Sequence, residues 1–153
     1  MKNNNFLLRQ VEDMCNSDKS SKFYNITILA NISALLFHEI SNLNWLGFYI
    51  LDNDFLYLGP FQGKVACDKI PVGKGVCGSC VLKNKTIKVD NVHLFAGHIA
   101  CDNNSNSELV TPIYKDGKIF GVLDIDSPYE NNFSDDDIIL FEKIANIISF
   151  NLK

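Results

Sequence analysis

The sequence predicts one α+β domain in which a central, mostly antiparallel sheet carries helices from both ends of the chain. Three observations support this prediction: two segments with the pattern of β-hairpins, an apolar helical repeat before the first hairpin, and a capped helical repeat near the C-terminus. A chain of 153 residues is long enough to bury one hydrophobic core and too short for two. Residues 1–153 are therefore expected to form a single domain.

Helices are expected at both ends of the chain. Apolar residues recur at helical spacing through residues 20–40 and predict a long amphipathic helix, which we expect Ser20 and Ser21 to cap. Residues 1–19 before it are expected to be either helical or poorly ordered. Near the C-terminus, Ser134 precedes three aspartates and another apolar repeat, so it is expected to cap a closing helix whose first turn is acidic.

Two β-hairpins are expected between these helices. Residues 45–61 carry aromatic and branched side chains on both sides of a short Asp/Asn turn, which is typical of an antiparallel pair. Residues 108–114 and 119–126 flank an Asp-Gly dipeptide, which supplies the positive φ angles of a tight turn. If pairing runs regularly from that turn, paired residue numbers sum to about 233, which places Glu108 opposite Ile125.

Composition and charge exclude several classes of function. The formal net charge is −4 and the 14 basic residues are scattered, so no nucleic-acid partner is expected. The polar N-terminus has too few apolar residues for a signal peptide, and no stretch approaches the ~18 apolar residues of a membrane span. The protein is therefore expected to be cytoplasmic, without a membrane partner.

In a reducing compartment, five cysteines indicate redox catalysis or metal binding rather than a disulfide framework.

Glycines and cysteines are concentrated in residues 62–107, which predicts flexible loops that carry chemistry on a rigid frame. Cys101 lies in a polar stretch that predicts an exposed loop, and His98 could stabilise its thiolate if the loop turns back. Cys67 and Cys77 lie among further glycines. Thiols in three flexible segments suit a nucleophile with resolving partners, because a sulfenic acid on one cysteine must meet another within bonding range.

A zinc site is an alternative interpretation of the same segment. A C-x-x-C pair and an H-x-x-C pair together offer four tetrahedral ligands, namely Cys77, Cys80, His98 and Cys101. A loop cysteine without any special role is a further alternative for Cys101.

Three acidic residues and two aromatic residues are candidates for a binding site. Asp124 and Asp126 are two residues apart on a predicted strand and share a face, with Glu108 near the same end of the hairpin. Clustered carboxylates can hold an ammonium group, and their repulsion can keep one of them protonated near neutrality. Trp45 and Tyr49 share a face of another strand and could wall a methyl-thioether pocket. A solvated strand face and ordinary core aromatics are the alternatives.

Six strings between residue 44 and the final helix form an ordered set: NWLGFY at 44–49, LGPFQGKVAC at 58–67, GKGVCG at 73–78, GHIACD at 97–102, SNSELV at 105–110 and GVLDIDS at 121–127. With this set, the chain resembles the free methionine-(R)-sulfoxide reductases, enzymes built on a GAF domain. The resemblance implies a GAF-like fold and oxidoreductase activity on the free amino acid. Generic GAF domains bind many ligands, so the fold without these strings would imply no function.

The resemblance implies that three cysteines act together. Cys101 corresponds to the family's catalytic cysteine, Cys67 to its resolving partner, and Cys77 to a third cysteine that can join the disulfide relay. Two cysteines depart from the family pattern: Cys80 stands where the family usually has a small residue without a thiol, and Cys15 lies in the poorly matched N-terminal region. Because of this extra thiol, either Cys67 or Cys77 could form the final disulfide.

The resemblance also implies roles for the acids and the aromatic residues. The family's substrate-binding and oxygen-activating carboxylates correspond to Glu108, Asp124 and Asp126. The aromatic walls around the substrate methyl group correspond to Trp45 and Tyr49. Because three acids would disfavour a nearby Cys101 thiolate, either the substrate ammonium or His98 is expected to offset their charge.

The implied reaction needs no metal or organic cofactor. The Cys101 thiolate attacks the sulfoxide sulfur while a protonated Glu108 or Asp126 donates to the departing oxygen. Cys67 condenses with the resulting sulfenic acid, and thioredoxin or a similar dithiol reduces the disulfide. The resemblance further implies a homodimer with the N-terminal helices at its contact. The nonenzymatic alternatives are a GAF-type small-molecule sensor and the Cys/His zinc module, neither of which would turn over substrate.

Overall fold

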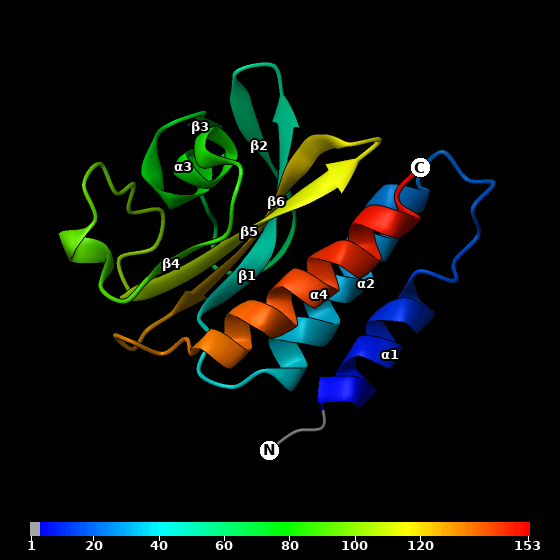
Figure 1. Ribbon diagram of the computed structural model, residues 1–153, viewed down its shortest axis with the longest axis horizontal. Coiled ribbons are helices and arrows are strands. Elements are labelled where there is room, and N and C mark those ends of the chain that lie inside the picture. Colours follow the sequence, from blue (N-terminus) through cyan, green and yellow to red (C-terminus); the bar gives the residue numbers. More distant parts are fainter. Residues whose placement is uncertain (1–3) are drawn as a thin grey trace.

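The computed structural model describes residues 4–153, which form α-helices, one 3-10 helix and a single six-stranded sheet (Figure 1). The elements follow one another in the order α1 (Asn4–Met14), α2 (Tyr24–Glu39), β1 (Trp45–Asp52), β2 (Phe55–Gly63), β3 (Lys69–Pro71), α3 (Gly75–Lys83), β4 (Ile87–Val89), η1 (Val92–Leu94), β5 (Ser107–Lys115), β6 (Lys118–Ser127) and α4 (Asp135–Asn151). Neighbouring strands pair antiparallel throughout, in the order β3-β2-β1-β6-β5-β4. The predicted α+β fold with a central antiparallel sheet is therefore confirmed.

Helices cover the two faces of the sheet unequally. Figure 1 shows α1, α2 and α4 together on one face, where they bury the larger hydrophobic cluster. The shorter α3 and the loops around it lie over the other face, above a second cluster that includes Cys77 and Cys80. The cysteine-rich segment is therefore held on the face opposite the three long helices. Within residues 4–153, no helix is both long and apolar enough to cross a membrane.

The closing helix begins as predicted, whereas the first long helix does not. In α4, the Ser134 hydroxyl accepts the Asp137 N–H and the Asp137 carboxylate accepts the Ser134 N–H, which completes a capping box. The prediction that a serine pair caps the first long helix is wrong, because α2 begins at Tyr24 and has no side-chain cap. The Ser21 hydroxyl accepts the Phe23 N–H in the preceding turn instead.

A β-bulge in the second hairpin changes the predicted pairing. Near the turn the strands pair as expected, but Phe120 is an extra residue on β6, and beyond it the partners shift by one. The prediction of Glu108 opposite Ile125 is therefore wrong, since Glu108 pairs with Asp126. A shift of one residue exchanges the two faces of a strand, so the bulge brings Glu108 to the same face as the two aspartates of β6.

The central strand β1 continues this face. Trp45 pairs with Asp126 and Gly47 with Asp124, so β1 presents both residues to the same side as the acids. Gly47 is required here, because an added Cβ would lie 2.3 Å from the Cβ of Phe61 and 2.7 Å from the Trp45 ring. The missing side chain leaves room for the Trp45 ring to stack on Phe61, with ring centroids 5.4 Å apart.

Candidate active site

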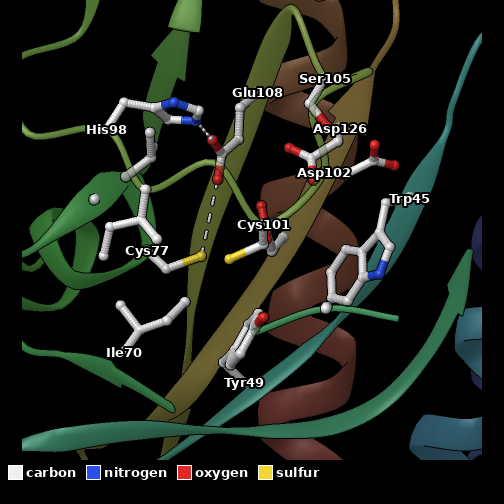
Figure 2. Close-up of a pocket in the computed structure, with 15 residues that line it drawn as sticks. Trp45, Tyr49, Ile70, Cys77, His98, Cys101, Asp102, Ser105, Glu108 and Asp126 are labelled. Atoms are coloured by element: carbon white, nitrogen blue, oxygen red, sulfur yellow. Dashed lines mark hydrogen bonds and ion pairs between the residues drawn. The ribbon is translucent and has the colours of Figure 1, made fainter. Parts of the chain in front are cut away.

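A small cavity lies over the shared face of β1, β5 and β6, on the side of the sheet that carries α3 (Figure 2). Its volume is about 30 Å³, which is enough for a water molecule or an ion but not for an amino acid. Seven of the eight site residues predicted from the sequence line it: Trp45, Tyr49, Cys77, Cys101, Glu108, Asp124 and Asp126. The eighth, Cys67, is joined to Cys101 by a disulfide. The structure therefore brings all the predicted residues together around one cavity.

The three predicted thiols are in different states. Cys67 and Cys101 form a disulfide with a Cα–Cα distance of 5.3 Å, which joins the loop after β2 to the loop before β5. Cys77, in the first turn of α3, is free and donates to Glu108 Oε1 at 3.9 Å. Figure 2 shows its sulfur turned toward that of Cys101. The cavity thus presents a free thiol and a disulfide to the same space.

The remaining two cysteines do not line this cavity. Cys15 is buried in the cluster beneath α1 and α2, on the other face of the sheet. Cys80 is also buried, and its Sγ donates to the Val110 carbonyl at 3.8 Å. The zinc set offered by the C-x-x-C and H-x-x-C pairs is not assembled, because Cys80 is turned to β5 and Cys101 is held in a disulfide.

The three predicted acids form the polar wall of the cavity. Glu108 and Asp124 are each 6% exposed, and Asp126 is partly exposed. Burial, and after it the charge of another acid in the group, raises the pKa of each of the three carboxyls well above its usual value. Asp124 Oδ1 is buried without a hydrogen-bond partner. The acids therefore hold their protons more strongly than usual, and a positively charged ligand beside them would favour their ionised forms.

Burial beside the acids also keeps Cys77 protonated. A thiol in the first turn of a helix usually ionises more readily, because the N-terminal end of the helix dipole is positive. Here desolvation, and after it the charges of Asp124, Glu108 and Asp126, raises the pKa of the Cys77 thiol well above its usual value. Cys77 is therefore a poor nucleophile while the cavity stays closed and contains no cation.

His98 links the acids to solvent. Its Nε2 lies 3.6 Å from Glu108 Oε2, and its side chain is 14% exposed. Burial lowers the pKa of His98, so the ring is mostly uncharged at neutral pH. The sequence suggested that this histidine stabilises the Cys101 thiolate, but the structure places it against Glu108. From there it can pass a proton between that carboxyl and water.

Aromatic rings form the apolar wall. Trp45 stacks on Tyr49 and on Phe61, with centroid distances of 5.9 and 5.4 Å. The Trp45 indole N–H donates to the Lys64 carbonyl at 3.1 Å, and the Tyr49 hydroxyl donates to the Cys67 carbonyl at 2.9 Å. The two predicted aromatics thus also anchor the loop that carries Cys67. Sequence reasoning did not assign them this role and did not identify Phe61.

Sequence reasoning also missed a polar network beside Cys101. The Asn44 side-chain amide donates to Asp102 Oδ2 at 3.0 Å and to Ser105 Oγ at 2.9 Å. Asp102 and Ser105 line the cavity, and Ser105 hydrogen-bonds to Asp126. All three residues lie inside the six ordered motifs, and this was the only feature of the sequence that could have identified them as site residues. Their polar character pointed only to an exposed loop.

The free energy of unfolding is expected to carry a contribution from the buried acids that is lost as pH rises. Below their unfolded-state pKa values of about 4, folded and unfolded chains both hold these protons and the contribution is fully present. As pH rises, the unfolded chain releases the protons first, because the pKa values of Glu108 and Asp124 are raised in the folded protein. The free energy of unfolding of Asp124→Asn, taken relative to that of the wild type, should therefore be higher at pH 8 than at pH 5.

Urea unfolding of the disulfide form across this pH range measures that difference. Asp54→Asn makes the same chemical change at an exposed turn position, and its stability curve should run parallel to that of the wild type. A parallel curve for Asp124→Asn as well would mean that burial does not shift the ionisation of Asp124.

The fold and the site together define a class of protein, the GAF domains that carry a thiol site. The GAF domain family matches residues 29–153. The free methionine-R-sulfoxide reductase of Escherichia coli (strain K12) is 54% identical over 112 residues, which covers 73% of this chain and 68% of that protein. The chain belongs to the family of free methionine-R-sulfoxide reductases.

Solved structures agree with this assignment. The fRMsr of Staphylococcus aureus in its reduced form has a TM-score of 0.91 and 48% identity, covering 99% of this chain and 96% of that chain. The free methionine-R-sulfoxide reductase of Neisseria meningitidis, solved in complex with its substrate, has a TM-score of 0.89 and 37% identity, covering 97% and 87%. The resemblance seen in the six motifs is therefore confirmed.

Proposed function

We propose that this protein reduces free L-methionine-(R)-sulfoxide to L-methionine, with Cys101 as the attacking sulfur and Cys67 as its resolving partner. The observation that carries the proposal is the disulfide between these cysteines, beside a cavity whose polar wall consists of three carboxyl groups with raised pKa values. The names of the relatives support the same reaction. As an oxidoreductase, the protein would use the sulfoxide as its oxidant, since the substrate sulfur accepts the two electrons that the two thiols give up.

The acids account for a preference for the free amino acid. Within the described chain, the residues that line the cavity include no lysine or arginine to balance Glu108, Asp124 and Asp126. The α-ammonium of free methionine sulfoxide would supply that positive charge. Methionine sulfoxide inside a peptide has no such ammonium and would leave the acids unbalanced, so it should be rejected. Trp45 and Tyr49 offer the methyl-sulfur end an apolar wall.

Substrate binds the reduced form. In the disulfide form the cavity measures about 30 Å³, whereas ligand pockets usually measure about 300 Å³ or more. The bond between Cys67 and Cys101 ties together two loops over the cavity. Reduction of this bond releases the loops, and the pocket then enlarges to accept an amino acid.

The chemical steps conserve atoms and electrons. The Cys101 thiolate attacks the sulfoxide sulfur, and a protonated carboxyl group, Glu108 or Asp126, donates to the oxygen. The oxygen then transfers from the substrate sulfur to the Cys101 sulfur, as the S–O bond and the transient bond between the two sulfurs break. Methionine leaves as a thioether, and Cys101 is left as a sulfenic acid. The Cys67 thiol then forms the disulfide and releases water. A dithiol such as thioredoxin restores both thiols by exchange and is itself oxidised.

Three further features belong to the proposal. Thioredoxin or a similar dithiol is the reductant, no metal or organic cofactor takes part, and the protein acts in the cytoplasm as a homodimer. The N-terminal helices carry exposed apolar side chains: Phe6 on α1 is 61% exposed, and at the start of α2 Phe23 is 57% and Ile26 is 59% exposed. These side chains would supply an apolar surface for a contact between N-terminal helices. Sedimentation at several protein concentrations measures the oligomeric state.

A coupled assay tests the reaction. NADPH consumption is followed with thioredoxin and its reductase, and three substrates are offered in parallel: free methionine-(R)-sulfoxide, the free (S) epimer, and the N-acetylated (R) form. We expect turnover of the free (R) form alone, because acetylation removes the charge that the acids bind. A fourth reaction with dithiothreitol distinguishes failure of thioredoxin as a reductant from failure of catalysis.

The sensor alternative is tested by the same assay. No methionine from any substrate, even with dithiothreitol and fully reduced thiols, would disprove the proposed reaction. Binding of an amino acid without turnover would then favour a ligand sensor.

A further inference from the structure

Three buried side chains in the cavity wall place metal-binding atoms close together. The Sγ of Cys77 and one carboxylate oxygen each from Glu108 and Asp124 all lie within 4.8 Å of one another. The Cys77 sulfur is 3.9 Å from Glu108 Oε1. A tetrahedral zinc ion holds sulfur and oxygen ligands about 3.6 Å apart, at bond lengths of about 2.3 and 2.1 Å. The Cys77–Glu108 pair is already close to this spacing, whereas the 4.8 Å limit allows for a larger contraction of the pairs that include Asp124.

An unpartnered oxygen indicates the same kind of ligand. Asp124 is 6% exposed, and its Oδ1 has no hydrogen-bond partner. The Asp124 side chain interacts with those of Cys77 and Glu108 and lines the same cavity. Buried acidic groups are costly to ionise unless a cation accompanies them. A bound cation would therefore give this oxygen the partner that the protein does not supply.

We propose that Cys77, Glu108 and Asp124 bind one divalent cation of the zinc group, such as Zn²⁺ or Cd²⁺. One sulfur and two carboxylate oxygens suit these ions, whereas Mg²⁺ and Ca²⁺ prefer oxygen ligands alone. The cavity volume of about 30 Å³ exceeds what one water molecule needs and is too small for an amino acid. The disulfide form thus has room for an ion that completes its coordination with water, and it excludes methionine sulfoxide.

Binding exchanges protons for the ion and transfers no electrons. The Cys77 thiol and the two carboxyl groups release their protons to water as the metal–ligand bonds form, so the affinity rises with pH. The ion would lie where the substrate ammonium is proposed to bind, and Zn²⁺ is therefore expected to raise the apparent KM for methionine sulfoxide. This consequence rests on the proposed function, whereas metal binding itself does not.

A cadmium titration of the disulfide form tests the site without any substrate. In this form Cys67 and Cys101 cannot bind metal, so a sulfur-to-cadmium charge-transfer band in the ultraviolet reports on a free thiol. We expect the band to saturate at one equivalent of Cd²⁺. Cys77→Ser should abolish the band, and Asp124→Asn should weaken binding about tenfold or more.

Cys80→Ser is the matched control, because Cys80 is a buried free thiol on the same helix that does not line the cavity. It should keep the band and the affinity unchanged. The proposal is overturned if no band saturates at one equivalent, or if Cys80→Ser loses it as fully as Cys77→Ser. Asp124→Asn retains every thiol, so full affinity in that folded variant would also contradict the site. A protein that binds Cd²⁺ yet reduces no sulfoxide would disprove the proposed function alone.

Discussion

Replacing Cys101 with serine is expected to abolish methionine formation, lowering its single-turnover rate constant to roughly a thousandth of the wild-type value or less. A serine hydroxyl is a weak nucleophile at neutral pH and cannot accept the sulfoxide oxygen as a sulfenic acid. A single-turnover reaction measures the effect, with prereduced protein in excess over methionine-(R)-sulfoxide and chromatographic detection of free methionine.

Two further variants separate the nucleophile from its partner. Cys67→Ser should still form methionine in the first turnover and then retain a sulfenic acid, which a dimedone-type reagent traps. Cys15→Ala changes a buried thiol on the other face of the sheet and should leave the first turnover unchanged. If Cys101→Ser formed methionine at the wild-type rate, another thiol would have to be the attacking group. Cys77 would be the first candidate, because it lines the same cavity.

Replacing Glu108 with glutamine is expected to lower kcat by a factor of about 10²–10⁴, which is the usual contribution of a general acid. Burial, and after it the charge of Asp126, raises the pKa of Glu108 well above its usual value, which favours the protonated carboxyl that a proton donor requires. The amide of glutamine has nearly the same shape but no acidic proton. We expect Glu108 to be the donor because His98, 3.6 Å away and partly exposed, can return a proton to it after each turnover.

The pH dependence of kcat distinguishes the two candidate donors. In the wild type, kcat should decline as the pH rises through the pKa of Glu108, and Glu108→Gln should lack this decline. Asp126→Asn should keep the decline and mainly raise KM. Glu142→Gln makes the same chemical change on an exposed part of α4 and should behave as the wild type. Loss of the decline in Asp126→Asn instead would make Asp126 the proton donor.

The architecture could be predicted because its signals are local. The apolar repeats, the Ser134 capping box and the Asp-Gly turn each depend on residues a few positions apart, and all three are present in the structure. The start of α2 could not be predicted in the same way. Ser20 and Ser21 are suitable cap residues by type, but Ser20 donates to the Asp18 carboxylate and Ser21 accepts the Phe23 N–H, so neither caps the helix.

The identities of the site residues could be predicted, but not their mutual positions. Regular pairing from the turn would have placed Glu108 on the opposite face from Asp124 and Asp126, and one extra residue, Phe120, reverses that outcome. The network of Asn44 with Asp102 and Ser105 joins segments about sixty residues apart in the chain, which no local pattern indicates.

The sequence by itself determined the class of fold, the family, and the types of residue in the site, because periodicity, turn chemistry and ordered motifs are all written along the chain. Only the tertiary structure decided which groups meet. It places the Cys77 thiol and His98 on the same carboxyl of Glu108, leaves an oxygen of Asp124 without a partner, and closes the cavity to about 30 Å³. The reason is physical: strand register and loop path decide which side chains share a space. The burial of those side chains then raises the pKa values of the acids and of the Cys77 thiol.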